Sequence, residues 1–154
     1  DLPPADLVGP LYPQQAVSRL TVPNTVRTVS ATFPDGTTPS FVANRTPRRE
    51  LADWATSPRN PFFARNFANR TWAHFFGTGI VDPVDEPGEA NPPSQPELLT
   101  VLARGLIDAG FDRKVLIRAI AASRAYQLAS VQSDPSQANP RRFARMPVRG
   151  LTGQ

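Results

Sequence analysis

The stretch from Thr46 to Gly79 constrains the fold of this chain more than any other part of the sequence. It holds both tryptophans, five of the nine phenylalanines and the only histidine. It also contains two helix starts of one kind, Thr46-Pro47 and Asn60-Pro61, in which a side-chain oxygen can cap free amides and proline takes the first helical position. The sequence therefore predicts two consecutive helices, at about 47–56 and 61–76.

The apolar residues of each predicted helix share one face. In the first helix Leu51, Trp54 and Ala55 follow the i, i+3, i+4 spacing of a narrow apolar stripe. Gly77 is well placed to end the second helix in the left-handed conformation. The second helix gathers its apolar positions within half a turn of arc, with Arg65, Asn66, Asn69 and Arg70 on the other side. Its apolar arc comprises Phe63, Ala64, Phe67, Ala68, Thr71, Trp72 and Phe75.

Two further helices are predicted after the first pair. Ser94 and Glu97 have the spacing of a capping box, which opens a helix at about 95–109. Gly110 ends that helix, and Asp112 caps another at about 113–126. We expect a four-helix core across residues 46–126, in which the following side chains are largely buried: Trp54, Phe63, Phe67, Trp72, Phe75, Leu102 and Ile120.

Prolines are frequent outside the predicted helices. The full sequence has 18 prolines in 154 residues. The prolines predict that residues 1–45 form an extended arm. Within it, residues 25–33 and 40–43 could pair as a short hairpin across the turn Pro34-Asp35-Gly36. Residues 131–154 read as an irregular tail whose order depends on docking. The predicted fold class is therefore mainly α, with a helical domain at 46–130 between the arm and the tail.

Composition limits the classes of function. The absence of cysteine excludes disulfides, thiolate metal sites and a covalent haem motif within this sequence. The net charge of +4 invites a nucleic-acid interpretation, but no basic stripe interleaved with aromatic residues is present. No apolar run is long enough to span a bilayer, and no signal peptide opens the sequence. We expect no membrane span, and we rank nucleic-acid binding third among the candidate functions.

The residues that could carry chemistry are few. His74 lies at the edge of the predicted apolar arc, so we expect a buried, hydrogen-bonded structural histidine. The acidic loop at 82–89 lacks the spacing of a calcium loop, so we predict no metal site. We also predict a clamp in which Arg70 bonds a loop carboxylate while asparagine amides satisfy loop backbone groups. The residues of this hypothetical clamp are Asn66, Asn69, Arg70, His74, Asp82, Asp85 and Glu97.

Five blocks of sequence, in one order, resemble a known family. It is the C-terminal domain of unknown function of large secreted planctomycete proteins that often also carry a cytochrome-c-like domain. The resemblance covers about residues 46–130. Its blocks are Pro47-Arg48-Arg49-Glu50-Leu51-Ala52-Asp53-Trp54; Asn60-Pro61-Phe62-Phe63-Ala64-Arg65; Asn69-Arg70-x-Trp72-x-His74-x-Phe76-Gly77-x-Gly79-Ile80-Val81-Asp82; Pro92-Pro93-Ser94-x-Pro96-Glu97-Leu98-Leu99; and Leu116-Ile117-Arg118-x-Ile120-x-x-Ser123-x-x-Tyr126.

The resemblance implies an exported protein of the periplasm or cell envelope and a chain that is part of a longer polypeptide. It supplies no catalytic residue. We favour a non-catalytic helical scaffold or interaction module of a larger assembly, with any haem on a partner and with contacts made through the N-terminal arm and exposed arginines. The alternative is a hydrolase or carbohydrate-processing domain that uses His74, Arg70 and the acidic loop 82–89.

Overall fold

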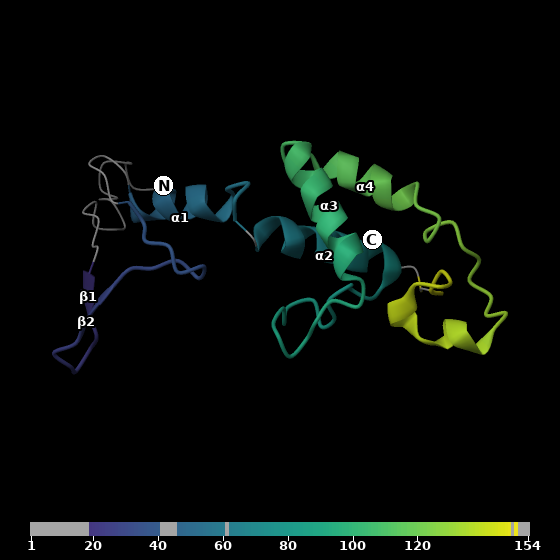
Figure 1. The fold of residues 1–154 in the computed structure, drawn as a ribbon, viewed down its shortest axis with the longest axis horizontal. Helices are drawn as coiled ribbons and strands as arrows, with labels where there is room; N and C mark the ends of the chain where they lie inside the picture. Colours follow the sequence, from purple (N-terminus) through teal and green to yellow (C-terminus); the bar gives the residue numbers. More distant parts are fainter. Residues whose placement is uncertain (1–18, 41–45, 61, 149, 151–154) are drawn as a thin grey trace, which may run out of the picture. The chain divides into compact units, whose positions relative to one another are not determined.

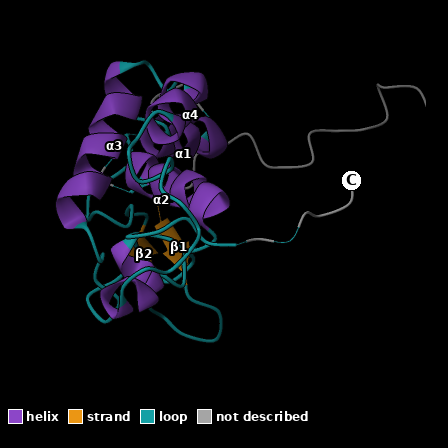
Figure 2. Ribbon diagram, turned by 90° about the vertical axis from the view of Figure 1, so that its right-hand side faces the viewer, coloured by secondary structure: helices purple, strands orange, loops and turns teal. Residues whose placement is uncertain are grey.

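The computed structural model describes residues 19–40, 46–60, 62–148 and 150. Within these residues the elements follow one another along the chain as Figure 1 shows, and Figure 2 separates them by type. The predicted mainly α fold with an irregular tail is confirmed. The elements are β1 (Arg19–Thr21), β2 (Thr28–Ser30), α1 (Pro47–Ala55), α2 (Phe63–Phe76), α3 (Pro96–Asp108), α4 (Arg113–Ala121) and the 3-10 helices η2 (Pro135–Ala138) and η3 (Pro140–Arg142).

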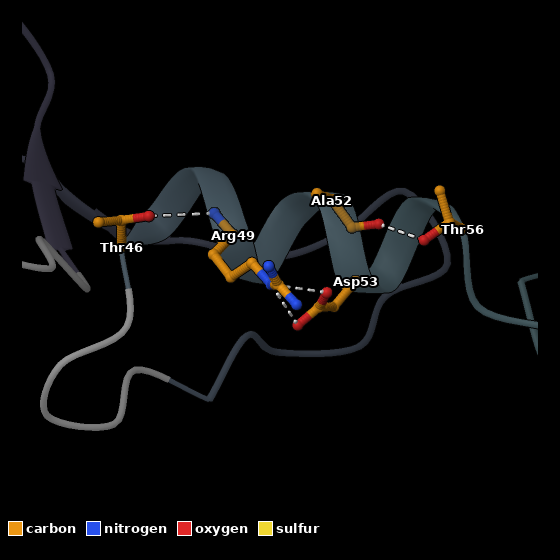
Figure 3. A network of polar contacts seen from close by, with 5 residues as sticks. All are labelled: Thr46, Arg49, Ala52, Asp53 and Thr56. Atoms are coloured by element: carbon orange, nitrogen blue, oxygen red, sulfur yellow. Dashed lines mark hydrogen bonds and ion pairs between the residues drawn. The ribbon is translucent and has the colours of Figure 1, made fainter.

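The first helix begins where its capping residue predicts, whereas α2 begins at Phe63, with Phe62 rather than Asn60 as its capping residue. The Thr46 hydroxyl accepts a hydrogen bond from the Arg49 amide at 3.2 Å, as Figure 3 shows. Asn60 Oδ1 accepts from the amides of Phe62 at 2.7 Å and Phe63 at 3.2 Å. Both side chains thus satisfy amides that a helix start leaves without an intrahelical acceptor.

The remaining local signals for helix ends are also confirmed. Asp112 caps α4 by accepting from the Lys114 amide at 2.8 Å. Gly77 closes α2 in the left-handed region at φ +74°. Gly110, at φ +61°, follows α3, where the Gly110 amide donates to Ile107 and the Phe111 amide to Leu106. This pair of bonds is the Schellman arrangement, which satisfies carbonyls at a helix end.

The capping box predicted at Ser94 and Glu97 is wrong. Helix α3 has Gln95 as its capping residue and begins at Pro96. The Ser94 hydroxyl instead donates to the carbonyl of Ile80 at 3.0 Å. A long-range partner has therefore replaced the local amide as the partner of this serine.

The predicted extent of the fourth helix is also too long. Helix α4 ends at Ala121, and turns follow it. These turns bring the Tyr126 ring edge-on to Phe75, with ring centroids 5.4 Å apart, and to Phe76, at 6.1 Å. Aromatic packing against α2 thus overrides the helical propensity of the segment after Ala121.

The short hairpin exists, but its strands differ from the prediction. Strand β2 pairs with the preceding β1, with Arg19 opposite Ser30, because residues 22–27 form a turn of their own. Residues 41–43, the predicted partner, lie outside the described residues, as do residues 1–18 of the arm. The turn at Pro34–Gly36 is confirmed, since Gly36 has φ +82° and its amide donates to Phe33 at 2.9 Å.

The chain divides into two compact units, residues 1–57 and 58–154. In the first unit, Trp54 of α1 stacks on Phe33 with ring centroids 4.7 Å apart, and its indole N–H donates to Asp35 at 2.9 Å. No residue of α1 is buried. Trp54 is only half-buried, so its prediction as a core residue is wrong.

The second unit holds the hydrophobic core, where α2 packs on α3 and α3 on α4. Trp72, Leu102 and Ile120 are buried as predicted, whereas Phe67 and Phe75 are half-buried at its edge. Phe63 is 37% exposed, contrary to prediction, and its ring packs beside the half-buried rings of Phe67 and Phe111. The buried apolar residues are Ala64, Ala68, Trp72, Phe76, Ile80, Val81, Leu99, Leu102, Ala103, Leu106, Leu116, Ile120 and Phe143.

Phe143 is the buried tail residue of this core, and Met146 packs against the core partly buried. Phe143 is 8% exposed and meets Trp72 edge-on, with ring centroids 5.1 Å apart, and Phe76 at 5.5 Å. Its backbone is left-handed at φ +49°, which is uncommon for a residue with a bulky side chain. The aromatic contacts therefore hold the tail on α2 after η3.

Candidate functional site

The connection between α2 and α3, residues 77–95, is bonded to α2 by a buried asparagine. Asn69 is 3% exposed. Its Nδ2 donates to the Val81 carbonyl and its Oδ1 accepts from the Val81 amide, both at 2.9 Å. One side-chain amide thus pairs with both backbone groups of a buried residue, as a neighbouring strand would. This exchange fixes the start of the connection on the helix.

Glycine at position 79 allows this close approach. A Cβ atom there would lie 2.3 Å from the Val81 carbonyl oxygen and 3.1 Å from Asn69 Nδ2. The first distance is far inside van der Waals contact, and its partner is a backbone atom that cannot rotate away. Gly79 is therefore required by the geometry that Asn69 imposes.

Four further hydrogen bonds close the connection into a defined loop. The Ile80 carbonyl accepts from the Ser94 amide at 2.8 Å and from its hydroxyl at 3.0 Å, which joins the start of the loop to its end. Asn91 Nδ2 donates to the carbonyls of Pro83 at 3.3 Å and Glu86 at 3.1 Å. Proline has no backbone N–H to donate, so regular backbone pairing is limited in this loop. Hydrogen bonds from polar side chains order it instead.

The tail contacts the same loop. The guanidinium of Arg141 in η3 donates to the Pro92 carbonyl at 3.2 Å. The sequence gives no signal for this bond, because its two residues lie far apart in the chain. The loop is therefore held both by α2 and by the C-terminal segment.

A groove of about 270 Å³ lies between α2 and this loop. Its walls are largely apolar, and the amides of Asn66, Asn69 and Asn91 and the guanidinium of Arg65 supply the polar groups. Such a surface can hold an apolar chain segment and hydrogen-bond its backbone. The groove is lined by Phe62, Arg65, Asn66, Asn69, Val81, Val84, Pro87, Gly88, Asn91, Pro93 and Leu99.

The structure brings together some of the residues of the predicted clamp. Arg70 forms an ion pair with Asp85, and both side chains are exposed. Asn66 is exposed on the groove wall. Asp82 and Glu97 are exposed and take no part in the Arg70 ion pair. The functional role of the clamp stays a prediction.

The predicted burial of His74 is wrong. The side chain is exposed, and its ring lies edge-on to Phe75 at 5.6 Å. A position at the edge of the apolar arc can face either way, and here the core lies on the other side. Among the described residues, no three histidine or acidic side chains lie close enough together to hold a metal ion.

A family model matches more than half of the chain. The model PSD1, Protein of unknown function (DUF1553), matches residues 47–154. The chain belongs to this family. The match reaches beyond residues 46–130 and includes the tail, in which Phe143 packs on the core. Because the function of the family is unknown, the match assigns no residue a role. Comparisons with curated proteins and with solved structures gave no match.

Over the residues that are described, no helix has the length and apolar character needed to cross a bilayer.

Proposed function

We propose that this member of the PSD1 family is a non-catalytic interaction module whose groove holds an extended segment of a partner protein. The observation that carries the proposal is the groove itself, which has apolar walls, the exposed polar side chains of Arg65 and Asn66, and a loop fixed by buried bonds. A pre-formed surface of this kind binds without the entropic cost of ordering a loop.

The chemistry of the groove favours binding over hydrolysis. Its polar side chains are three carboxamides and one guanidinium, none of which exchanges a proton near neutral pH. General acid and base catalysis needs a group that does. His74, the residue best suited to that task, is not among the residues that line the groove.

The wider setting follows from the sequence resemblance. We place the module in a larger exported assembly of the periplasm or cell envelope, in which a cytochrome-c-like partner or domain would supply redox chemistry. The arm at 1–45 and the exposed arginines would add contacts with partner proteins. The family match supports the resemblance to a domain of unknown function, and the proposed setting is inferred from that resemblance.

Site-specific crosslinking tests the proposal. Val84 in the groove is replaced by p-benzoylphenylalanine, in the full polypeptide within its own cells, and Val101 on α3 serves as the control. Val101 is 68% exposed and does not line the groove. We expect a discrete crosslinked protein from position 84 that position 101 does not give. Equal crosslinking from both positions would contradict the proposal.

The partner protein that the crosslink identifies is then purified. Calorimetry measures its binding to the groove directly. Asn66→Trp would fill the groove, whereas Val101→Trp adds the same ring elsewhere. We expect the first change to weaken binding at least about tenfold, which corresponds to about 1.4 kcal/mol, and the second to leave it unchanged. Equal affinities would place the partner on another surface.

The alternative function is a hydrolase or carbohydrate-processing domain that uses His74, Arg70 and the acidic loop. The exposed Arg70–Asp85 pair beside α2 is the observation in its favour. Purified chain incubated with chromogenic glycosides and esters decides between the two. Turnover that is lost in His74→Ala, with the fold intact, would replace the module by the enzyme.

A further inference from the structure

A second hollow, of about 190 Å³, lies where the start of α2 meets α3. Its apolar floor includes Ala64 and Ala103, which are buried, and Ile107. Two alanines at facing positions leave space between the helices that larger side chains would fill. The hollow is lined by Pro58, Arg59, Asn60, Ala64, Arg65, Thr100, Ala103, Arg104 and Ile107.

Three arginines and no acidic residue line this hollow. Arg59, Arg65 and Arg104 are exposed. Across the described ranges, neither Arg65 nor Arg104 forms an ion pair with a carboxylate, in contrast to Arg70 with Asp85. An anion in the hollow is attracted by the charges of Arg65 and Arg104, neither of which is neutralised by a carboxylate among the described residues. The positive end of the α2 dipole adds to this attraction.

We propose that the hollow binds a phosphate monoester group, with its oxygens on the arginines and its attached carbon atoms on the apolar floor. A guanidinium presents a planar fork of donors that matches the oxygens of phosphate. A phosphate monoester carries about two negative charges at neutral pH, whereas a carboxylate or a sulfate ester carries one. Arg65 and Arg104 therefore attract a phosphate monoester more strongly than an anion with a single charge.

This site goes beyond the proposed function. The hollow lies beside the groove, and Arg65 lines both. Arg104 lines the hollow only, so a change at Arg104 tests the phosphate site without altering the groove.

Titration of the full chain with phenyl phosphate, followed by NMR and calorimetry, tests the proposal. We expect the backbone signals of Thr100, Ala103 and Arg104 to shift and saturate. Inorganic phosphate, which lacks the ring, should bind several-fold more weakly, because it makes no contact with the apolar floor. Phenyl sulfate should also bind more weakly, because it carries a single charge.

Two matched variants locate the site. Arg104→Gln should reduce the affinity for phenyl phosphate about tenfold, as expected for loss of hydrogen bonds from a charged donor. Arg118→Gln removes the same charge from the exposed surface of α4, outside the hollow, and should change the affinity less than twofold. Unchanged thermal midpoints would show that both variants are folded.

Several results would overturn the assignment. They are equal losses in the two variants, saturable shifts that avoid the hollow, and no saturation with millimolar phenyl phosphate. Tighter binding of phenyl sulfate than of phenyl phosphate would also contradict selection by charge. A single-stranded oligonucleotide that shifts the same signals while phenyl phosphate does not would replace the monoester site by a nucleic-acid backbone site.

Discussion

The two tryptophans lie in regions that are held together in different ways. Trp72 is 2% exposed and stacks on Phe76, with ring centroids 4.1 Å apart, in the centre of the second unit. Trp54 in the first unit is half-buried, stacks on Phe33 and donates to the exposed carboxylate of Asp35. The second unit thus depends on buried packing and buried hydrogen bonds, and the first on local turn contacts. Substitutions should reveal this difference.

Trp72→Ala should have the largest effect. Removal of a buried indole leaves a cavity in the core, which costs about 3–5 kcal/mol of the free energy of unfolding. Trp54→Ala should cost about 1 kcal/mol, because a half-buried aromatic pair contributes less than a ring in the core. Denaturant titration followed by circular dichroism measures both. A loss below about 1 kcal/mol for Trp72→Ala would contradict the core described above.

Asn69→Ala should have the next largest effect. It leaves the Val81 amide and carbonyl buried without partners, and each such group costs about 1–3 kcal/mol. We expect a total loss of about 2–4 kcal/mol. Asn66→Ala, on the exposed surface of the same helix, is the control and should change stability by less than about 0.5 kcal/mol. Equal effects would show that the Asn69 bonds do not hold the loop.

Gly79→Ala tests the same junction from the loop side. The added methyl group would meet the Val81 carbonyl oxygen at 2.3 Å, so the loop must shift, at a cost of about 1–3 kcal/mol. Gly88→Ala is the matched control, because a Cβ atom there meets nothing within 4 Å. Thermal melts of the two variants measure the difference. A stable Gly79→Ala protein with an unchanged loop would refute the close approach.

Arg70→Lys should have a smaller effect, because the Arg70–Asp85 pair is exposed and such pairs contribute less than about 1 kcal/mol. Lysine keeps the charge but loses the planar fork. We expect faster hydrogen exchange in residues 82–93 while α2 stays protected. Arg118→Lys serves as the control, and unchanged exchange in the loop would exclude a clamp at Arg70.

Local signals in the sequence predict the helices, whereas long-range partners decide the site. Thr46 and Asp112 cap their helices as predicted, and Asn60 accepts from the Phe62 amide just before α2, because the partner of each lies within three residues. Ser94 was assigned to a local cap, but its partner is Ile80, which no local pattern could reveal. For the same reason no local pattern in the sequence predicts the bond between Arg141 and Pro92.

The helical wheel explains the other differences. It placed Asn69 on the polar side of α2, yet Asn69 is buried, because the loop folds over that side. It placed His74 at the edge of the apolar arc, where the direction of the side chain depends on neighbours. A wheel gives the faces of one helix, but the loop and the tail decide which of them is covered.

Acid should act on the contacts around Trp54 through Asp35. The Asp35 carboxylate accepts from the Thr37 hydroxyl at 2.6 Å, the Trp54 indole at 2.9 Å and the Thr37 amide at 2.9 Å. These bonds lower the pKa of Asp35 below its usual value of 3.8, the Thr37 hydroxyl contributing most. The folded turn therefore favours the ionised carboxylate.

The sign of the pH effect follows from this depressed pKa. The stabilisation is fully present above about pH 3.8, the unfolded value, and is lost as the pH falls through the lower folded value. In a Trp72→Phe background, Trp54 fluorescence should therefore shift to longer wavelength in that acid range. Asp35→Asn should abolish the shift, whereas Asp53→Asn on the same helix as Trp54 should retain it. A shift that persists in Asp35→Asn would assign the acid response to another group and leave the Trp54 stack independent of Asp35.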